Sequence, residues 1–248
     1  YLRDTGEPTI TTINDALQNY FVMATHHLKI YSQILNNHNV VSLVMGHTIY
    51  LMYGMICHVA AARGIPVYGR KPGSTPLAIR CYRELRELKR FEIGFRKAEF
   101  EHFLCFHKER AIAFADEYMA KRLEGVGDPK VEVWNPSCYS DKNRIYTRDE
   151  LIQTLDLDPE KPIVMVMCHT FTDACHVDNR QFYSDYYEWF EETLSLISDI
   201  PDVNWVIKPH PDDKYYNSPV DNAVLMTRRF EEKASWIRLS PENMNTKS

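Results

Sequence analysis

The sequence predicts a mixed α/β protein with two domains. Strand-length apolar runs alternate with helical patterns twice along the chain, which is the main observation behind this prediction. A strand, a helix and a strand in close succession form a parallel pair, because the crossover between parallel strands needs about the length of a helix. The first such set is residues 40–45, 49–63 and 65–68, and the second is residues 163–167, 185–198 and 205–207.

Helical patterns flank the first strand pair. Apolar residues recur at helical spacing over residues 12–36, and a second long helix is predicted over residues 96–123. Gly64 follows the helix of the strand pair, and Gly125 follows the long helix, where glycine is favoured. A short alternating run at residues 131–134 predicts one more strand.

A polar stretch at residues 137–148 marks the expected boundary between the domains, which are residues 1–140 and 141–248. Thr147 begins the next helix, since Glu150 stands three residues later at the spacing of a capping box.

Three further elements are expected in the second domain. Ser184 is expected to cap the helix over residues 185–198, which carries an apolar stripe. Two weaker strands are predicted at residues 223–226 and 236–239.

Composition excludes some functional classes. The chain has 248 residues, 44% of them hydrophobic, and a net charge of −5, which gives no general case for nucleic-acid binding. It shows no membrane span and no signal peptide, so a cytoplasmic location is expected. The chain begins at Tyr1 and ends at Ser248 in mid-pattern, so we expect a fragment.

The cysteines lack a disulfide spacing and are expected to be reduced core thiols. They are residues 57, 81, 105, 138, 168 and 175.

Residues 70–97 are locally basic. One interpretation is a solvated helix face. The other is a patch that faces an anionic acceptor or the acidic inner leaflet of the plasma membrane, with peripheral contact to that membrane.

The stretch over residues 203–211 is the strongest candidate for a functional site. It reads as a short apolar strand that runs into Lys208 and then into His210, which lies between two prolines. Each proline restricts its own backbone and that of the residue before it, so His210 is held rigidly. In open α/β sheets, ligands bind at this carboxyl end of the strands. The alternative is a surface histidine in a strand-ending turn.

Three loops that each follow a predicted parallel strand, residues 46–48, 168–173 and 208–212, are expected to line one cleft between the domains. His47 in the first loop has the chemistry of a general base, or else caps a helix or lies in the core. Thr170 and Thr172, with nearby amides, would hold a phosphate, although the glycine pattern of nucleotide-binding loops is missing. Lys208 and His210 would offset charge that develops on a leaving nucleotide.

Metal binding is the less favoured interpretation of two other motifs. Cys168-His169 and Cys175-His176 do not have the spacing of a standard zinc site. Asp156 and Asp158 precede a predicted strand rather than follow one, so they read as a turn. We therefore expect no metal and no loss of activity in chelators.

Several of these stretches together resemble the capsule polysaccharide biosynthesis family of bacterial glycosyltransferases. The order and spacing of the stretches carry this resemblance, which runs from about residue 40 to residue 211. The matching stretches are residues 46–50 with 53–54, 60–68, 118–125, 168–174, 185–189 and 205–211.

The resemblance implies two Rossmann-like domains in the GT-B architecture, with an incomplete C-terminal domain. It implies transfer of a sugar from a nucleotide donor, with CMP- or CDP-linked donors favoured, to a glycan or lipid-linked acceptor. His210 would contact the donor phosphate or the leaving nucleotide, together with Lys208, His169, Thr170, Thr172 and Asp173, and His47 would lie on the acceptor side.

Two other functions stay open at this stage. A sugar-nucleotide epimerase of the same architecture would need further residues beyond Ser248, and a non-catalytic protein that binds glycans or nucleotides would be compatible with a shortened donor domain. No cofactor is expected apart from the nucleotide-sugar, which is a substrate.

Overall fold

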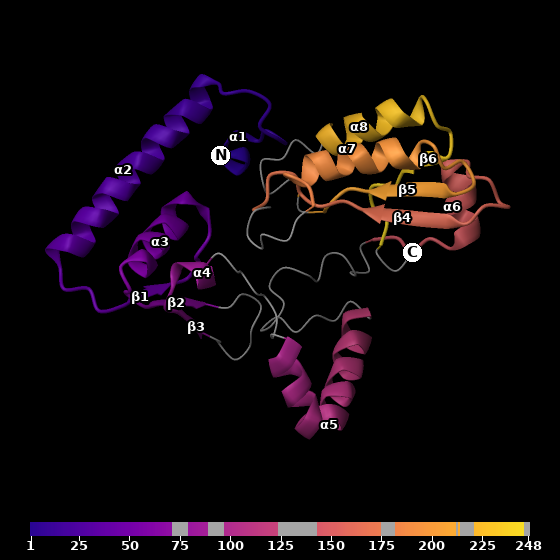
Figure 1. Ribbon diagram of the computed structural model, residues 1–248. Coiled ribbons are helices and arrows are strands. Elements are labelled where there is room, and N and C mark those ends of the chain that lie inside the picture. Colours follow the sequence, from indigo (N-terminus) through magenta and orange to yellow (C-terminus); the bar gives the residue numbers. More distant parts are fainter. Residues whose placement is uncertain are drawn as a thin grey trace. The chain divides into compact units, whose positions relative to one another are not determined.

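The computed structural model describes residues 1–70, 79–88, 97–123, 143–174, 182–211, 213 and 221–245 (Figure 1). The described residues fall into two compact units. The N-terminal unit is built mainly from Thr11–Ile112, and the C-terminal unit comprises Tyr1–Ile10, Ala113–Asp173 and Phe182–Ser248. Each unit has its own three-stranded sheet, which confirms the prediction of a mixed α/β protein.

The sheet of the N-terminal unit contains the predicted strand–helix–strand unit and one further strand. Strands β1 (Leu43–Met45) and β2 (Val67–Arg70) pair in parallel, as predicted, and the crossover between them is helical. Strand β3 (Ile79–Tyr82) adds to β2 in the antiparallel direction. This strand lies in the basic stretch and was not predicted, because four residues give too short an alternation to recognise.

The crossover helix differs from the prediction at its start. The predicted helix over residues 49–63 is a π-helical turn at Tyr50–Gly54 followed by α3 (Met55–Ala62). Gly64 follows it with a positive φ of 75°, as the sequence predicted. Cys57, Ala60 and Ala61 of α3 are buried in the core of this unit, and α4 (Leu85–Leu88) adds Leu88 to it.

Two long helices follow the predicted ranges closely. Helix α2 (Asp15–Asn37) begins where the Asn14 side chain accepts a hydrogen bond of 2.8 Å from the Leu17 amide. Helix α5 (Lys97–Leu123) has one break, at His107, whose backbone is not helical. None of the helices in the described ranges combines the length and the apolar character needed to cross a membrane.

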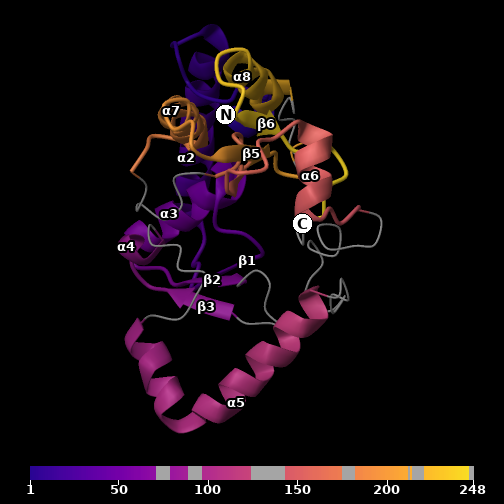
Figure 2. The ribbon, with the colours of Figure 1, turned by 90° about the vertical axis from the view of Figure 1, so that its right-hand side faces the viewer.

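The C-terminal unit is a parallel sheet between two layers of helices (Figures 1 and 2). Its strands β4 (Ile163–Met167), β5 (Asn204–Lys208) and β6 (Ile237–Leu239) run in the order β4–β5–β6 and are parallel throughout. All three strands were predicted, and apolar cover on both faces is typical of parallel sheets.

The two faces of this sheet are covered by different helices. Helices α7 (Tyr186–Ile197) and α8 (Asp221–Glu231) pack on one face with a core around Phe190, Ile207 and Ile237. Helix α6 (Arg148–Leu155) packs on the other face, where Leu151 meets Tyr146 and Met244. The capping box of Thr147 and Glu150 is present as predicted. A single helical turn, α1 (Leu2–Thr5), lies near Tyr1.

Two predictions for the C-terminal unit are wrong. Residues 223–226 form part of α8 rather than a strand, because a short apolar run does not distinguish a buried helix from a strand. The N-cap of α7 is Asp185 rather than Ser184, and the Ser184 amide instead donates a 2.7 Å hydrogen bond to Glu188. The strand predicted at residues 131–134 lies outside the described residues, as do residues 137–142 of the predicted boundary stretch.

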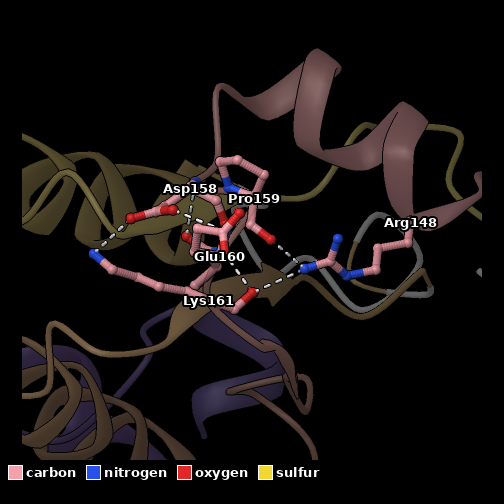
Figure 3. Close-up of polar contacts among 6 residues, drawn as sticks. Arg148, Asp158, Pro159, Glu160 and Lys161 are labelled. Carbon is pink, nitrogen blue, oxygen red and sulfur yellow. Dashed lines mark hydrogen bonds and ion pairs between the residues drawn. The ribbon is translucent and has the colours of Figure 1, made fainter.

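A polar turn closes the sheet at the amino ends of β4 and β5 (Figure 3). Asp158 accepts a hydrogen bond from the Glu160 amide and pairs with Lys161, so this segment is a turn, as predicted. Asn204, only 1% exposed, donates to the carbonyls of Asp158 and Lys161 and accepts from the Asp158 amide. Arg148 reaches the same turn from α6 and donates to the carbonyl of Lys161.

We expect Asn204→Ala to lower the free energy of unfolding by about 2–3 kcal/mol, because three backbone groups of the turn lose a buried partner. Urea unfolding measures this change. Arg148→Ala is the matched control: it removes an exposed partner of the same turn and should cost less than about 1 kcal/mol. An equal loss of unfolding free energy in Asn204→Ala and Arg148→Ala would contradict a special role for the buried Asn204 side chain.

Candidate functional site

The loops after β4 and β5 emerge side by side at the carboxyl edge of the C-terminal sheet. Met167 is paired with Lys208 in the parallel register, and the Cys168 amide donates a 2.9 Å hydrogen bond to the Lys208 carbonyl. This pairing brings the two predicted loops, residues 168–173 and 208–211, to the same edge. Sequence reasoning therefore identified two loops that the fold places together.

Three rings are stacked at this edge. The rings of His169 and His210 have centroids 5.6 Å apart and planes inclined by 28°. The ring of Tyr186 lies 4.0 Å from that of His169 at an interplanar angle of 12°. Tyr186 is the first residue of α7, and the sequence analysis did not single it out as a site residue. The sequence signal that could have identified Tyr186 is its position: it is an aromatic residue at the start of the helix that follows the β4 loop.

Backbone hydrogen bonds involve the ring of His169 and the main chain of His210. Nδ1 of His169 lies 3.2 Å from the carbonyl oxygen of Thr170. A carbonyl only accepts, so Nδ1 carries the hydrogen of this bond and Nε2 of the neutral ring has the lone pair. His210 lies between Pro209 and Pro211, and its carbonyl accepts a 3.2 Å hydrogen bond from the Asp213 amide. Both imidazoles are half-buried.

Thr170 and Thr172 lie beneath the loop rather than on its surface. Their exposed fractions are 1% and 2%. Phe171 between them packs against Phe190 in the core and anchors the loop there. Within the part of the chain that the structure describes, Oγ1 of Thr170 has no hydrogen-bond partner. Buried polar groups without a partner are uncommon and each calls for an explanation.

Lys208 supports the segment that follows β6. Its Nζ donates a 2.5 Å hydrogen bond to the carbonyl of Met244. The same segment is held on its other side by Arg144, whose amide donates to the Asn243 carbonyl and whose carbonyl accepts from the Asn245 amide. The predicted phosphate partner thus has a structural contact at the strand end, and its role towards a ligand stays a prediction.

The start of α7 already carries a negative charge. Asp185 caps the helix by accepting a 2.8 Å hydrogen bond from the Glu188 amide, and its other oxygen accepts a 2.5 Å bond from the hydroxyl of Thr9. A carboxylate at this position satisfies the amide and offsets the positive end of the helix dipole. An anionic ligand at this edge therefore depends on the imidazoles more than on the helix end.

Cys168 is a poor candidate for a nucleophile or a metal ligand. Burial, and secondarily the nearby charge of Asp213, raises the pKa of the Cys168 thiol to about 12. The reactive and metal-binding form is the thiolate, which such a site suppresses. No group of three or more histidine, cysteine, aspartate or glutamate side chains is placed to hold a metal among the residues that the structure describes, and Cys175 and His176 lie outside them.

The other described cysteines are free, as predicted. Burial raises the pKa of the Cys57 thiol to about 11, and Cys81 is half-buried. Cys105 is exposed on α5, so the expectation of a core thiol is wrong at this position. The apolar residues around it in the sequence are spread around the helix rather than gathered on its covered side.

His47 lies in the N-terminal unit, directly after β1 and Gly46. Its Nδ1 accepts a 3.1 Å hydrogen bond from the Ile49 amide, so the hydrogen of the neutral ring is on Nε2. In this tautomer the outer nitrogen donates hydrogen bonds, whereas a general base needs a lone pair there. The expectation that His47 shares a cleft with the loops of the C-terminal unit stays a prediction.

Comparison of the chain with models of protein families, with curated proteins and with solved structures finds no match.

Thr170→Val should leave the free energy of unfolding unchanged or raise it by about 1 kcal/mol, because the hydroxyl that it removes has no partner in the fold. Thr227→Val is the matched control, since Thr227 of α8 is also buried and its Oγ1 lacks a partner within the described ranges. Urea unfolding compares the two.

If the Thr170 hydroxyl contributes to ligand binding, only Thr170→Val weakens the binding of cytidine nucleotides. A clear loss of stability in Thr170→Val would show instead that this hydroxyl is bonded within the fold.

Proposed function

We propose that this chain is a metal-independent glycosyltransferase of the GT-B architecture, with two Rossmann-like domains. It would transfer a sugar from a cytidine-linked donor to a growing bacterial surface polysaccharide. The observation that carries the proposal is the pair of imidazoles, His169 and His210, at the carboxyl ends of two adjacent parallel strands.

The chemistry of the reaction explains why such a pair is useful. When the glycosidic bond to the donor breaks, negative charge grows on the phosphate of the leaving nucleotide. Preorganised hydrogen-bond donors and positive charge at that point lower the barrier. His210, fixed between two prolines, would donate to the leaving phosphate, and His169 would lie beside it as a second imidazole.

The stack with Tyr186 supports this role because it fixes the planes of the imidazoles before a ligand binds. Preorganisation of this kind avoids rearrangement at the moment of reaction. Lys208 adds a positive charge at the end of β5, even while its Nζ bonds the Met244 carbonyl. Thr170, Thr172 and Asp173 shape the loop below, and its backbone amides are the further candidates for phosphate contacts.

The resemblance to the capsule polysaccharide family supports the substrate class. It covers the loops at residues 46–50, 168–174 and 205–211, and the histidine–proline pair resembles that of transferases that use CMP-linked acidic sugars or CDP-glycerol. By this resemblance His47 would act on the acceptor side, with the enzyme at the cytoplasmic face of the inner membrane. The tautomer of His47 favours hydrogen-bond donation to an acceptor hydroxyl over proton abstraction.

We expect His210→Ala to weaken the binding of CMP or CDP at least tenfold, because the fixed imidazole is removed from the phosphate position. A tenfold change corresponds to about 1.4 kcal/mol. Titration calorimetry on the 248-residue chain measures it. His38→Ala is the control: this exposed histidine follows α2 and should leave binding unchanged.

The same titrations separate the competing functions. Binding of a glycan with no binding of any nucleotide would favour a non-catalytic glycan-binding protein. Cytidine binding that survives in His210→Ala at nearly the original affinity would remove the basis for this proposal.

Cytidine nucleotide binding should be the same in EDTA as in buffer with Mg²⁺, since the proposed phosphate contacts come from side chains and amides. Calorimetry under both conditions tests this. A large loss of affinity in EDTA would instead require a metal ion between the protein and the phosphate.

A further inference from the structure

A cluster of three rings lies at the carboxyl end of β1 in the N-terminal unit. The ring of His47 has its centroid 5.1 Å from that of Tyr50 and 6.2 Å from that of Tyr53. We call these three residues the His47 cluster. Tyr53 is 47% exposed and His47 is also exposed, so the cluster presents aromatic surface to solvent.

The backbone of Tyr50 has an unusual conformation. Tyr50 and Asp156 are the two non-glycine residues with positive φ in the described ranges, with values of 63° and 52°. Asp156 is the C-cap of α6, a position where a left-handed residue is common. Tyr50 instead begins a π-helical turn, and for a bulky residue a positive φ is an outlier. Such strained residues gather at ligand sites.

Tight packing holds this turn in its conformation. A Cβ atom on Gly69 would lie 2.9 Å from Cγ2 of Thr48, and one on Gly54 would lie 3.1 Å from the carbonyl oxygen of Thr48. Both glycines thus leave room for Thr48, which directly follows His47 and precedes the strained turn by two residues. The rings of the His47 cluster are therefore mounted on a rigid support.

The cluster offers flat apolar faces with hydrogen-bonding groups at their edges. The edges carry two phenol hydroxyls and the Nε2–H of His47, whose Nδ1 is bonded to the Ile49 amide. The cluster contains no lysine or arginine. These properties favour an uncharged ligand that has an apolar face and a rim of hydroxyls, rather than a phosphate.

We propose that the His47 cluster is a subsite for a neutral pyranose ring. The axial C–H groups on one face of such a ring pack on a phenol ring, and its equatorial hydroxyls reach the polar edges. Naming this sugar as part of the acceptor glycan rests on the proposed function, whereas binding of the sugar does not.

The test is binding of three neutral hexasaccharides, maltohexaose, cellohexaose and the N-acetylglucosamine hexamer, to the 248-residue chain by saturation-transfer NMR. We expect at least one of them to bind. Tyr53→Ala should weaken its binding about tenfold, and Tyr53→Phe should keep most of it because the stacking face remains. Phe21→Ala is the control, since Phe21 is a 64% exposed aromatic residue on α2 of the same unit.

Tyr50→Gly gives a second, independent readout. Glycine adopts a positive φ without strain, so this variant should raise the midpoint of thermal unfolding while it weakens sugar binding. A purely structural role for Tyr50 would move stability and binding in the same direction.

Failure of this inference is distinguishable from failure of the proposed function. CDP binding should survive in Tyr53→Ala, and hexasaccharide binding should survive in His210→Ala. Absence of binding to all three hexasaccharides, or an equal loss in Phe21→Ala and Tyr53→Ala, overturns the subsite. Binding of free cytidine in place of the sugars, lost in the same tyrosine variants, also overturns it.

Discussion

The parallel pairing of β4 with β5 is the constraint on which the candidate site depends. It places Met167 opposite Lys208, so the chain leaves both strands at the same level and in the same direction. His169 and His210 follow at nearly equal distances along the two strands. A shift of one residue in this register would displace the two loops relative to each other along the strands. The polar turn at the opposite edge, centred on buried Asn204, holds the same register from its other end.

Three ionisable side chains near the imidazoles, those of Cys168, Asp185 and Lys208, are buried or bonded within the fold. The Cys168 thiol is kept neutral by burial, and the Asp185 carboxylate is occupied by the start of α7 and by Thr9. Lys208 is committed to a carbonyl of the segment after β6. An imidazole changes its charge near neutral pH and both donates and accepts hydrogen bonds. The imidazoles are therefore the groups at this edge that the proposed function assigns to the leaving nucleotide.

Local patterns predicted the fold where they were long or chemically specific. The capping box of Thr147 and Glu150 needs two residue types at one spacing, and the parallel strands of the C-terminal unit are continuous apolar runs. Residues 223–226 were predicted as a strand because they form a short apolar run. Their helical pattern becomes visible only when Thr227 and Phe230, which are buried on the same helix, are included. The four residues of β3 belong to a sheet because β2 lies beside them, which no local pattern reveals.

The candidate site was predictable only in part, for the same reason. His169 and His210 were found because each follows a strand, and parallel strands end at one edge. Tyr186 comes from a helix start, and its stacking on His169 depends on how the loop returns to the sheet. Thr48, two residues before the strained Tyr50, fits against Gly54 and against Gly69 of β2, which is distant in sequence. Such contacts are set by tertiary packing rather than by sequence neighbours.

The hydrogen bond between Thr9 and Asp185 joins residues 176 positions apart and attaches the first segment of the chain to the cap of α7. A ribosome adds about 5–20 residues per second, so roughly 10–35 s separate the synthesis of these two partners. During that interval the residues from Thr11 to Ile112 are complete and free to fold, while the opening segment has no docking surface yet. The contact between Thr9 and Asp185 is thus a late, long-range step in the assembly of the C-terminal unit.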